Sequence, residues 1–508
     1  MRVQITKTIS NPKSRTPSVR RVLATLLCSL VALPAMAQVP QAEYAARRDS
    51  LAAAMSDGVL IALGGHEPAE DYLSFYPSPS FYYLTGLTEP EAVLVLVKRQ
   101  SRVSMTLFVQ PRDPAREVWT GARLGVEGVT RATGVSARTK DKLRTALDSL
   151  LANSRTLSVI GDLSGDGFAT RDEQFVAALQ RDHPALTVVR ANDLVDHLRM
   201  RHSAAELALE RKAIDITVRA QHDAIAAMRP GMNEFEMQAL IEYTFRRNGA
   251  DRPSFASIVG SGPNSTALHY SANDRFMRAG DVVVMDIGAS YRGYAADVTR
   301  TVPVSGTFSP EQRAVYEIVR AAQHAAEVVA KLGATSSDMD SAANRVLSAG
   351  LARLGLIESP DAVFDAGSGE CRRRVAAGCL QFSLYYFHAL GHAIGLEVHD
   401  PTSFQIQPGN TFTIEPGIYV RPTVLDELPS TPRNRAMIAK LRPVVQRYAN
   451  IGVRIEDDYF ATDSGVEWIS RGPRELSEIE QLMRAHTTVP APRDSSIVDW
   501  YRQTSPNQ

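Results

Sequence analysis

The sequence predicts an α+β protein in which a smaller α/β domain precedes a large domain made of two similar halves. Apolar runs of strand length alternate with helical stretches up to about residue 197. Beyond residue 255, strand-like and helical segments mix, and one short pattern occurs there twice. Because 508 residues are too many for one compact core, two or three domains are expected.

The first 37 residues have the pattern of a secretory signal peptide. Six basic residues and no acid precede the apolar run at 22–33, and Ala35-Met36-Ala37 forms a cleavage site. The apolar run is too short to span a membrane comfortably, so a membrane anchor is the weaker alternative, and no later segment resembles a span. We therefore expect export to the periplasm or the medium, with no stable membrane insertion after cleavage.

Charge and cysteine usage fit an exported protein that does not bind nucleic acid. Removing the leader leaves 50 basic and 56 acidic residues, a net charge of about −6, which argues against a nucleic-acid partner. The remaining cysteines, Cys371 and Cys379, could form a disulfide in an oxidising compartment, and two free thiols are the alternative.

Residues 38–198 are expected to form the first domain and residues 199–508 the second. Strands are predicted at 59–65, 92–98, 103–111 and 156–162, with helices at 140–152 and 172–182 between them. A long amphipathic helix should begin near residue 204 and end at Pro230-Gly231, and a second helix is expected at 234–248. Hairpin-like strands are predicted around 282–301 and 411–460.

Four carboxylates lie within apolar strand patterns of the second domain. VVMDIG (283–288) resembles FTIEPG (412–417), and GYAAD (293–297) resembles GVRIE (452–456), which places Asp286, Asp297, Glu415 and Glu456 in matching contexts. A buried charge is costly unless it is paired or binds a metal. For either aspartate alone, a partner arginine such as Arg292 or Arg300 is the ordinary explanation, but four acids together favour divalent metal ions.

The spacing of Asp286 and Asp297 depends on where the hairpin turns. A turn centred on Tyr291-Arg292 would place the two aspartates directly opposite each other, with β-carbons about 4.5–5.5 Å apart. A turn at Arg292-Gly293 would instead place Asp286 opposite Thr299. The sequence leaves both registers open, and in the first a shared cation would relieve the repulsion between the two carboxylates.

Three histidines follow within twelve residues, in FHALGHAIGLEVHD (387–400). His388 and His392 have zincin spacing, but Ala389 occupies the position where that motif requires glutamate. The cluster therefore predicts a mixed oxygen and nitrogen metal site of another kind. Two metals that hold a bridging hydroxide, a carboxylate that shuttles a proton and a histidine that stabilises an oxyanion predict hydrolysis, most simply of an amide.

Five motifs in this order resemble those of aminopeptidase P, the Xaa-Pro aminopeptidase of the M24 "pita-bread" metallopeptidases. They are LHY (268–270), MDIGASYRGYAADVTRT (285–301), HALGHAIGLEVHD (388–400), TIEPGIYV (413–420) and GVRIEDD (452–458). FYYLTGLTEPEAVLVLV (81–97) and EVWTGARLG (117–125) are similar as well, so the resemblance covers roughly residues 40–485. It implies removal of the N-terminal residue from peptides with proline in second position.

The resemblance also implies a role for each site residue. Two divalent ions, most commonly Mn²⁺, would be held by Asp286, Asp297, His392, Glu415 and Glu456, with Asp297 and Glu456 bridging. Glu415 would also shuttle the proton, and His388 and His399 would contact the substrate. His269 would seat the proline, and Arg454 would orient the carboxylates. The counterpart of Trp119 can approach a neighbouring active site in the family, so a homo-oligomer is expected; core packing is the alternative for Trp119 and for 81–83.

Two alternatives to an aminopeptidase follow from departures in the sequence. Ile287, Pro401 and the long segments 361–381 and 421–450 differ from the family pattern, and the latter segment could cap the cleft and change the accepted peptide length. A prolidase that cleaves only Xaa-Pro dipeptides is therefore the close alternative. A catalytically inactive peptide-binding protein and a metal-free creatinase-like enzyme are disfavoured, because all five ligand positions carry acids or histidine.

Overall fold

A computed structural model describes residues 38–485, except positions 71, 153, 166, 368–370 and 404. The predicted leader lies outside the described residues. Those from Val39 onward belong to one compact unit. Within the described ranges, no helix is long and apolar enough to cross a membrane.

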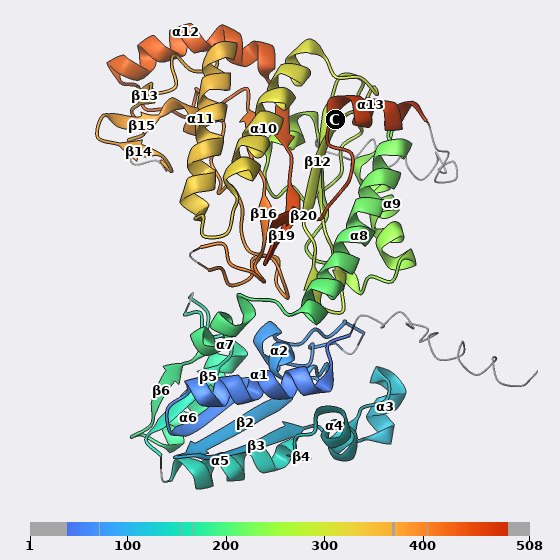
Figure 1. The fold of residues 1–508 in the computed structure, drawn as a ribbon, viewed down its shortest axis with the longest axis vertical. Coiled ribbons are helices and arrows are strands. Elements are labelled where there is room, and N and C mark those ends of the chain that lie inside the picture. The colour runs from blue at the N-terminus through green and yellow to red at the C-terminus, as the bar shows by residue number, and fades with distance from the viewer. Residues whose placement is uncertain are drawn as a thin grey trace, which may run out of the picture. The chain divides into compact units, whose positions relative to one another are not determined.

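The N-terminal part is built on a six-stranded mixed sheet of order β4-β3-β2-β1-β5-β6 (Figure 1). The strands are β1 (Gly58–Leu63), β2 (Val93–Arg99), β3 (Arg102–Val109), β4 (Ala137–Thr139), β5 (Thr156–Ile160) and β6 (Thr187–Arg190). β1 and β2 pair antiparallel, whereas β1 and β5 pair parallel. The helices are α1 (Gln41–Ala54), α2 (Pro79–Thr85), α3 (Pro114–Thr120), α4 (Gly125–Thr133), α5 (Leu143–Leu151), α6 (Arg171–Asp182) and α7 (Asn192–Arg199).

Both faces of this sheet are buried at its centre, which explains why β1 and the first five residues of β2 form continuous apolar runs. Leu60 and Ala62 pack with Leu51 of α1 on one face. Val59 and Ile61 point the other way and pack with residues of α5 and α6. The predicted strands and helices of this part are present, with ends displaced by a few residues.

The second part repeats one arrangement: a pair of helices followed by a strand hairpin. The first half contains α8 (Ala204–Ala227), α9 (Glu234–Arg247), β7 (Arg252–Pro253), β8 (Ile258–Ser261), β9 (Val282–Ile287), β10 (Ala289–Tyr291), β11 (Tyr294–Ala295) and β12 (Val298–Pro303). The second contains α10 (Pro310–Val329), α11 (Ser336–Leu354), β16 (Thr411–Ile414), β17 (Gly417–Val420), β18 (Ile451–Arg454), β19 (Asp457–Thr462) and β20 (Gly465–Trp468). In Figure 1, α8 lies beside α9 and α10 beside α11. The predicted α+β class with duplicated halves is confirmed.

The two long segments that depart from the family pattern add elements to the second half. Residues 361–381 contribute β13 (Val363–Phe364), β14 (Arg374–Val375) and β15 (Gly378–Leu380), and residues 421–450 contribute α12 (Pro432–Tyr448). Helix α13 (Leu476–Arg484) closes the described chain. A disulfide joins Cys371 to Cys379, so the bonded alternative for the two thiols is the one present.

The hairpin that carries Asp286 adopts the second of the two registers considered above. Asp286 pairs with Thr299, and Ser290 pairs with Ala295. The turn is at Arg292-Gly293, where both residues have positive φ of 53° and 85°. This conformation suits a two-residue hairpin turn and is one that glycine adopts freely. Asp297 is therefore a diagonal neighbour of Asp286 on the same face.

In the second hairpin the two acids stand directly opposite each other, as they would in the first of the two registers considered above. β16 pairs with β19 and β17 with β18 in one continuous register, in which Ile414 opposes Asp457 and Gly417 opposes Arg454. Glu415 thus stands opposite Glu456. Both hairpins lose regular pairing at the acids: around Gly288 and Asp297 in one, and around Glu415 and Glu456 in the other. These breaks bring the acids to a common centre.

Candidate metal centre

The acids and one histidine meet where the two hairpins face each other. The backbone N–H of Glu456 donates to the carbonyl of Thr299 at 3.1 Å, which ties one hairpin to the other. Asp286, Asp297 and Glu456 are buried, and Glu415 is partly buried. The duplicated strands therefore hold four acids in one protected place.

His392 reaches this centre from an extended segment and not from a helix. Thr413 donates its N–H to the carbonyl of His392 at 2.9 Å, and Ala393 bridges to Phe412 of β16. The His392 Nε2 atom lies 3.6 Å from Asp297 Oδ2, 3.7 Å from Glu415 Oε1 and 3.8 Å from Glu456 Oε1. One ligand atom each of Asp297, His392 and Glu456 lies within 4.8 Å of the others, as atoms around one ion do.

Asp286 stands beside this trio and is held by an arginine. An Arg454 Nη2 atom forms a very short contact with Asp286 Oδ2. Arg454 Nε donates to Thr299 Oγ1 at 3.2 Å, and that hydroxyl donates to Glu456 Oε2 at 2.7 Å. Arg454 therefore fixes two acids at once, directly and through Thr299. Of the arginines named as alternative partners, Arg300 instead pairs with Asp457 at 2.8 Å.

The protonation states in the metal-free protein show the cost of gathering these acids. Burial, reinforced by repulsion from Glu456 and Asp286, raises the pKa of Asp297 well above its usual range. Burial raises the pKa of Glu415 to about 8, and burial with repulsion from Glu415 raises the pKa of Glu456. Burial lowers the pKa of His392 to about 4, which keeps its imidazole neutral.

These residues fit divalent cations. Asp286 Oδ1 and Asp297 Oδ1 are both buried without a hydrogen-bond partner, and such atoms are rare unless an unseen ion or water satisfies them. Three or four carboxylates with one neutral imidazole form a donor set suited to Mn²⁺ or a similar ion. The raised carboxyl pKa values point the same way, because bound cations would offset both the burial of these acids and the repulsion among them.

Three more histidines border the centre. His388 Nδ1 lies 3.5 Å from Glu415 Oε2, and its Nε2 lies 2.9 Å from the hydroxyl of Tyr419. The ring of His399 lies 4.2 Å from that of His392, centroid to centroid. His269 is exposed in the turn after residues 262–266, next to Leu268, whose carbonyl accepts from Arg454 Nη2 at 3.4 Å. Burial lowers the pKa of His388 to about 3. The structure thus brings together all nine residues named from the sequence.

Tyr419 and Thr299 belong to the same network, but neither was predicted from the sequence as a site residue. Tyr419 OH accepts from Arg454 Nη1 at 3.0 Å and also contacts His388. The tyrosine lies within the TIEPGIYV motif, four residues after Glu415, so its position on the same face of the strand was available as a signal. Thr299 could be found only by choosing the correct hairpin register.

His399 is held in place by contacts of the next residue. Asp400 forms a very short contact with Arg199 of α7 and accepts the N–H of Glu397 at 2.9 Å. His202 lies 3.9 Å from Asp400 and 2.9 Å from the buried Glu210. Arg199 and Asp400 are both buried, so this ion pair anchors the loop that carries His399.

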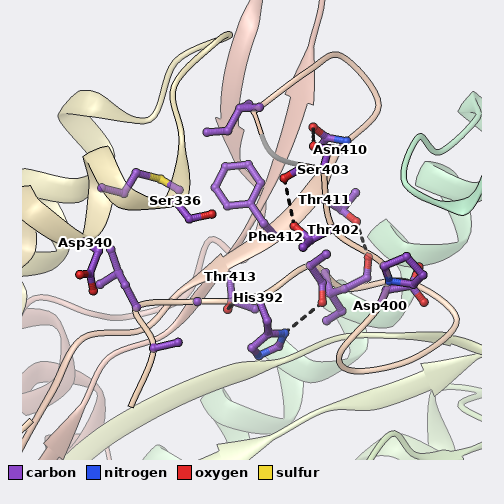
Figure 2. Close-up of a pocket in the computed structure, with 18 of the residues that line it drawn as sticks. Ser336, Asp340, His392, Asp400, Thr402, Ser403, Asn410, Thr411, Phe412 and Thr413 are labelled. Carbon is purple, nitrogen blue, oxygen red and sulfur yellow. Dashed lines mark hydrogen bonds between the residues drawn. The ribbon is translucent and has the colours of Figure 1, made fainter. Parts of the chain in front are cut away.

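A cavity of about 460 Å³ lies beside the centre (Figure 2). His392 lines its edge, and it is the only one of the five proposed ligands to do so. Asp340 of α11 and Asp400 stand on opposite sides in Figure 2, with Phe412 between them. A second cavity of about 520 Å³ is lined by His399, Arg199 and Asp193. Both cavities offer space next to the metal centre.

Trp119 and the segment at 81–83 occupy different environments. Trp119 is 76% exposed on α3, whereas Phe81 and Tyr83 are buried in the core of the N-terminal part. Core packing therefore accounts for Phe81 and Tyr83 but not for Trp119. A role for Trp119 in a homo-oligomer stays a prediction.

Comparison with known proteins shows matches to two family models, which together span most of the chain. Residues 208–463 match the family model described as Metallopeptidase family M24, and residues 44–160 match that of Aminopeptidase P, N-terminal domain. The domain boundary near residue 198 stays a prediction, since neither match fixes it.

The matches to individual relatives span nearly the whole length of each relative. The chain is 32% identical over 472 residues to the Xaa-Pro aminopeptidase of Escherichia coli (strain K12), which covers 89% of this chain and 99% of the relative. It is 30% identical over 490 residues to the Xaa-Pro dipeptidase of Homo sapiens, a match that covers 88% of this chain and 94% of the relative. A solved variant of Escherichia coli aminopeptidase P in complex with substrate has a TM-score of 0.73 and 29% identity, covering 88% of this chain and 99% of that one. The chain is a hydrolase that belongs to metallopeptidase family M24.

Proposed function

We propose that this protein is an exported Xaa-Pro aminopeptidase that works with two divalent cations, Mn²⁺ in the first instance. The observation that carries the proposal is the convergence of Asp286, Asp297, His392, Glu415 and Glu456 beside three further histidines. The Xaa-Pro aminopeptidase of Escherichia coli described above aligns with this chain over almost its full length.

Each residue of the centre has a role in this reaction. Two bound cations would supply a water activated for attack at neutral pH and an anchor for the free amino group of the peptide. Glu415 takes the proton of the attacking water and returns it to the proline nitrogen that leaves. His399 donates a hydrogen bond to the carbonyl oxygen as negative charge develops on it, and His388 contacts the substrate beside Glu415. His269 seats the proline, and Arg454 keeps Asp286 and Glu456 in position.

Export is supported by the leader pattern and by the disulfide. Residues 1–37 read as a cleavable signal peptide. The Cys371–Cys379 bond is of a kind that persists in oxidising compartments and is rare in the cytosol. Both features belong to the periplasmic or secreted proteins among which we place this chain.

A prolidase restricted to Xaa-Pro dipeptides is the second candidate, since the human Xaa-Pro dipeptidase is 30% identical to this chain. A panel of Xaa-Pro, Xaa-Pro-Yaa and Xaa-Ala-Yaa peptides with added Mn²⁺ separates the candidates. We expect release of the first residue from Xaa-Pro-Yaa and little cleavage of Xaa-Ala-Yaa. Cleavage of the dipeptides alone would establish the prolidase instead, and cleavage of none would favour an inactive peptide-binding protein.

A further inference from the structure

Arg372 lies beside the metal centre and has no partner among the described residues. Its side chain is exposed, and no hydrogen bond or ion pair joins it to any residue in the part of the chain that the structure describes. The next residue, Arg373, is by contrast paired with Asp340 at 2.6 Å. An unpaired guanidinium next to an active site is available to a ligand.

The hairpin that carries Arg372 is stapled to the second half of the fold. Cys371 is bonded to Cys379, which is fully buried in the main core. β15 pairs with β13 on one side and with β14 on the other. The disulfide therefore fixes the backbone next to Arg372 although the side chain itself is exposed.

Arg372 lines two neighbouring cavities. One is the 460 Å³ cavity that also touches His392. The other, of about 370 Å³, is called here the arginine cavity; it is lined by Phe364, Ala366, Arg372, Ser383, Leu384, Phe387, Arg421, Val424, Glu427, Leu428 and Pro429. The segment 387–392 lines both cavities: Phe387 borders the arginine cavity, and residues 389–392 border the other. Arg372 thus lines both cavities together with the segment that carries His388, which contacts the substrate in the proposed function.

The arginine cavity has a surplus of donors. Arg421 pairs with Glu427 at 3.3 Å, yet its Nε atom is buried without a hydrogen-bond partner. The Arg421 guanidinium also lies over the Phe387 ring at 5.9 Å. With Arg372 unpaired, this cavity offers two guanidinium groups and one carboxylate, which suits a small anion.

A short peptide can contact both Arg372 and the metal centre, because Arg372 lines the same cavity of about 460 Å³ as His392. In an Xaa-Pro-Yaa peptide, the C-terminal carboxylate lies two residues beyond the bond that is cut, a span of at most about 7 Å. The carboxylate is the only charge of such a peptide that the acidic metal centre does not attract.

We propose that Arg372 binds the C-terminal carboxylate of short peptide substrates at the mouth of the arginine cavity, so that the enzyme prefers short peptides with a free carboxylate. This inference rests on the proposed Xaa-Pro aminopeptidase function and adds a peptide-length preference to it. The residue belongs to the segment 361–381, which is longer than the family pattern and was not predicted to contribute to the site.

The test compares one tripeptide, Xaa-Pro-Yaa, as the free acid and as the C-terminal amide. A charge-assisted contact of this kind should make kcat/KM of the wild-type protein about 10-fold or more higher for the acid. In Arg372→Gln the two values should become nearly equal, through the loss for the acid alone. Arg372→Lys keeps the charge without the forked donor and should retain part of the preference.

Arg374→Gln is the matched control, because Arg374 is an exposed arginine of the same hairpin that lines neither cavity. It should keep the wild-type preference for the acid. An Arg372→Gln variant that keeps that preference, or a wild-type protein that cleaves acid and amide equally, would overturn the carboxylate site while leaving the proposed function in place. A wild-type protein that cleaves neither peptide would overturn both.

Discussion

Asp297→Asn is expected to abolish Xaa-Pro cleavage and to weaken metal binding. Asp297 Oδ2 lies 3.6 Å from His392 Nε2, and its other oxygen is buried without a partner, so this carboxylate stands at the middle of the proposed ligand set. A neutral amide cannot bridge two cations as a carboxylate does. The loss of activity should exceed the roughly 10–100-fold that follows from removing an outer partner of a metal ligand.

Metal content and thermal melting distinguish this loss from unfolding. The variant should hold fewer ions per chain than the wild type after the same Mn²⁺ treatment. Because burial and repulsion from Glu456 and Asp286 disfavour the charged form of Asp297, the metal-free variant should melt at or above the temperature of the metal-free wild type. Turnover near the wild-type value would remove Asp297 from the centre.

His399→Ala is expected to lower kcat by about 10²–10³-fold, the usual effect of losing a donor to a developing oxyanion. The ring lies 4.2 Å from that of His392 but is not among the proposed ligands, and the ion pair of Asp400 with Arg199 holds the loop independently of it. Metal content should therefore stay at the wild-type level.

His324→Ala, on the exposed surface of α10, provides the comparison. This substitution removes an exposed histidine that makes no contact with the metal centre, so both kcat and metal content should be unchanged. If His399→Ala instead strips the metal, His399 is a ligand and its assigned role is wrong. If it leaves kcat unchanged, His399 does not stabilise the oxyanion and its assigned role is wrong.

Much of the fold could be predicted because its signals are local. β1 and the first five residues of β2 are uninterrupted apolar runs, since both faces of the sheet are covered by helices there. Helix α8 begins at a capping box formed by Ser203 and Glu206 and stops just before Pro230-Gly231. Helix α12 was missed within the segment 421–450, where Pro443 lies inside the helix and argues against one.

The candidate site could be predicted in its composition but less well in its geometry. The repeated pattern around Asp286 and Glu415 brought out all four acids. The structure places Asp297, Glu415 and Glu456 at breaks of the two hairpins and Asp286 within β9 beside them. The register of the first hairpin stayed open, because a turn at Arg292-Gly293 and one a residue earlier are equally short. Arg372 was missed for a different reason: its position depends on a disulfide and on the packing of a segment distant in the chain.

The central claim is that five residues of this chain hold two divalent cations which the peptidase reaction requires. Native mass spectrometry of the full-length protein during Mn²⁺ titration, with Xaa-Pro-Yaa cleavage measured on the same samples, tests it most directly. We predict two ions per chain, activity that rises with their uptake, and loss of activity when a chelator removes them. A folded, Mn²⁺-supplemented protein that binds less than one ion per chain, or that cleaves the peptide undiminished in chelator, would contradict the claim.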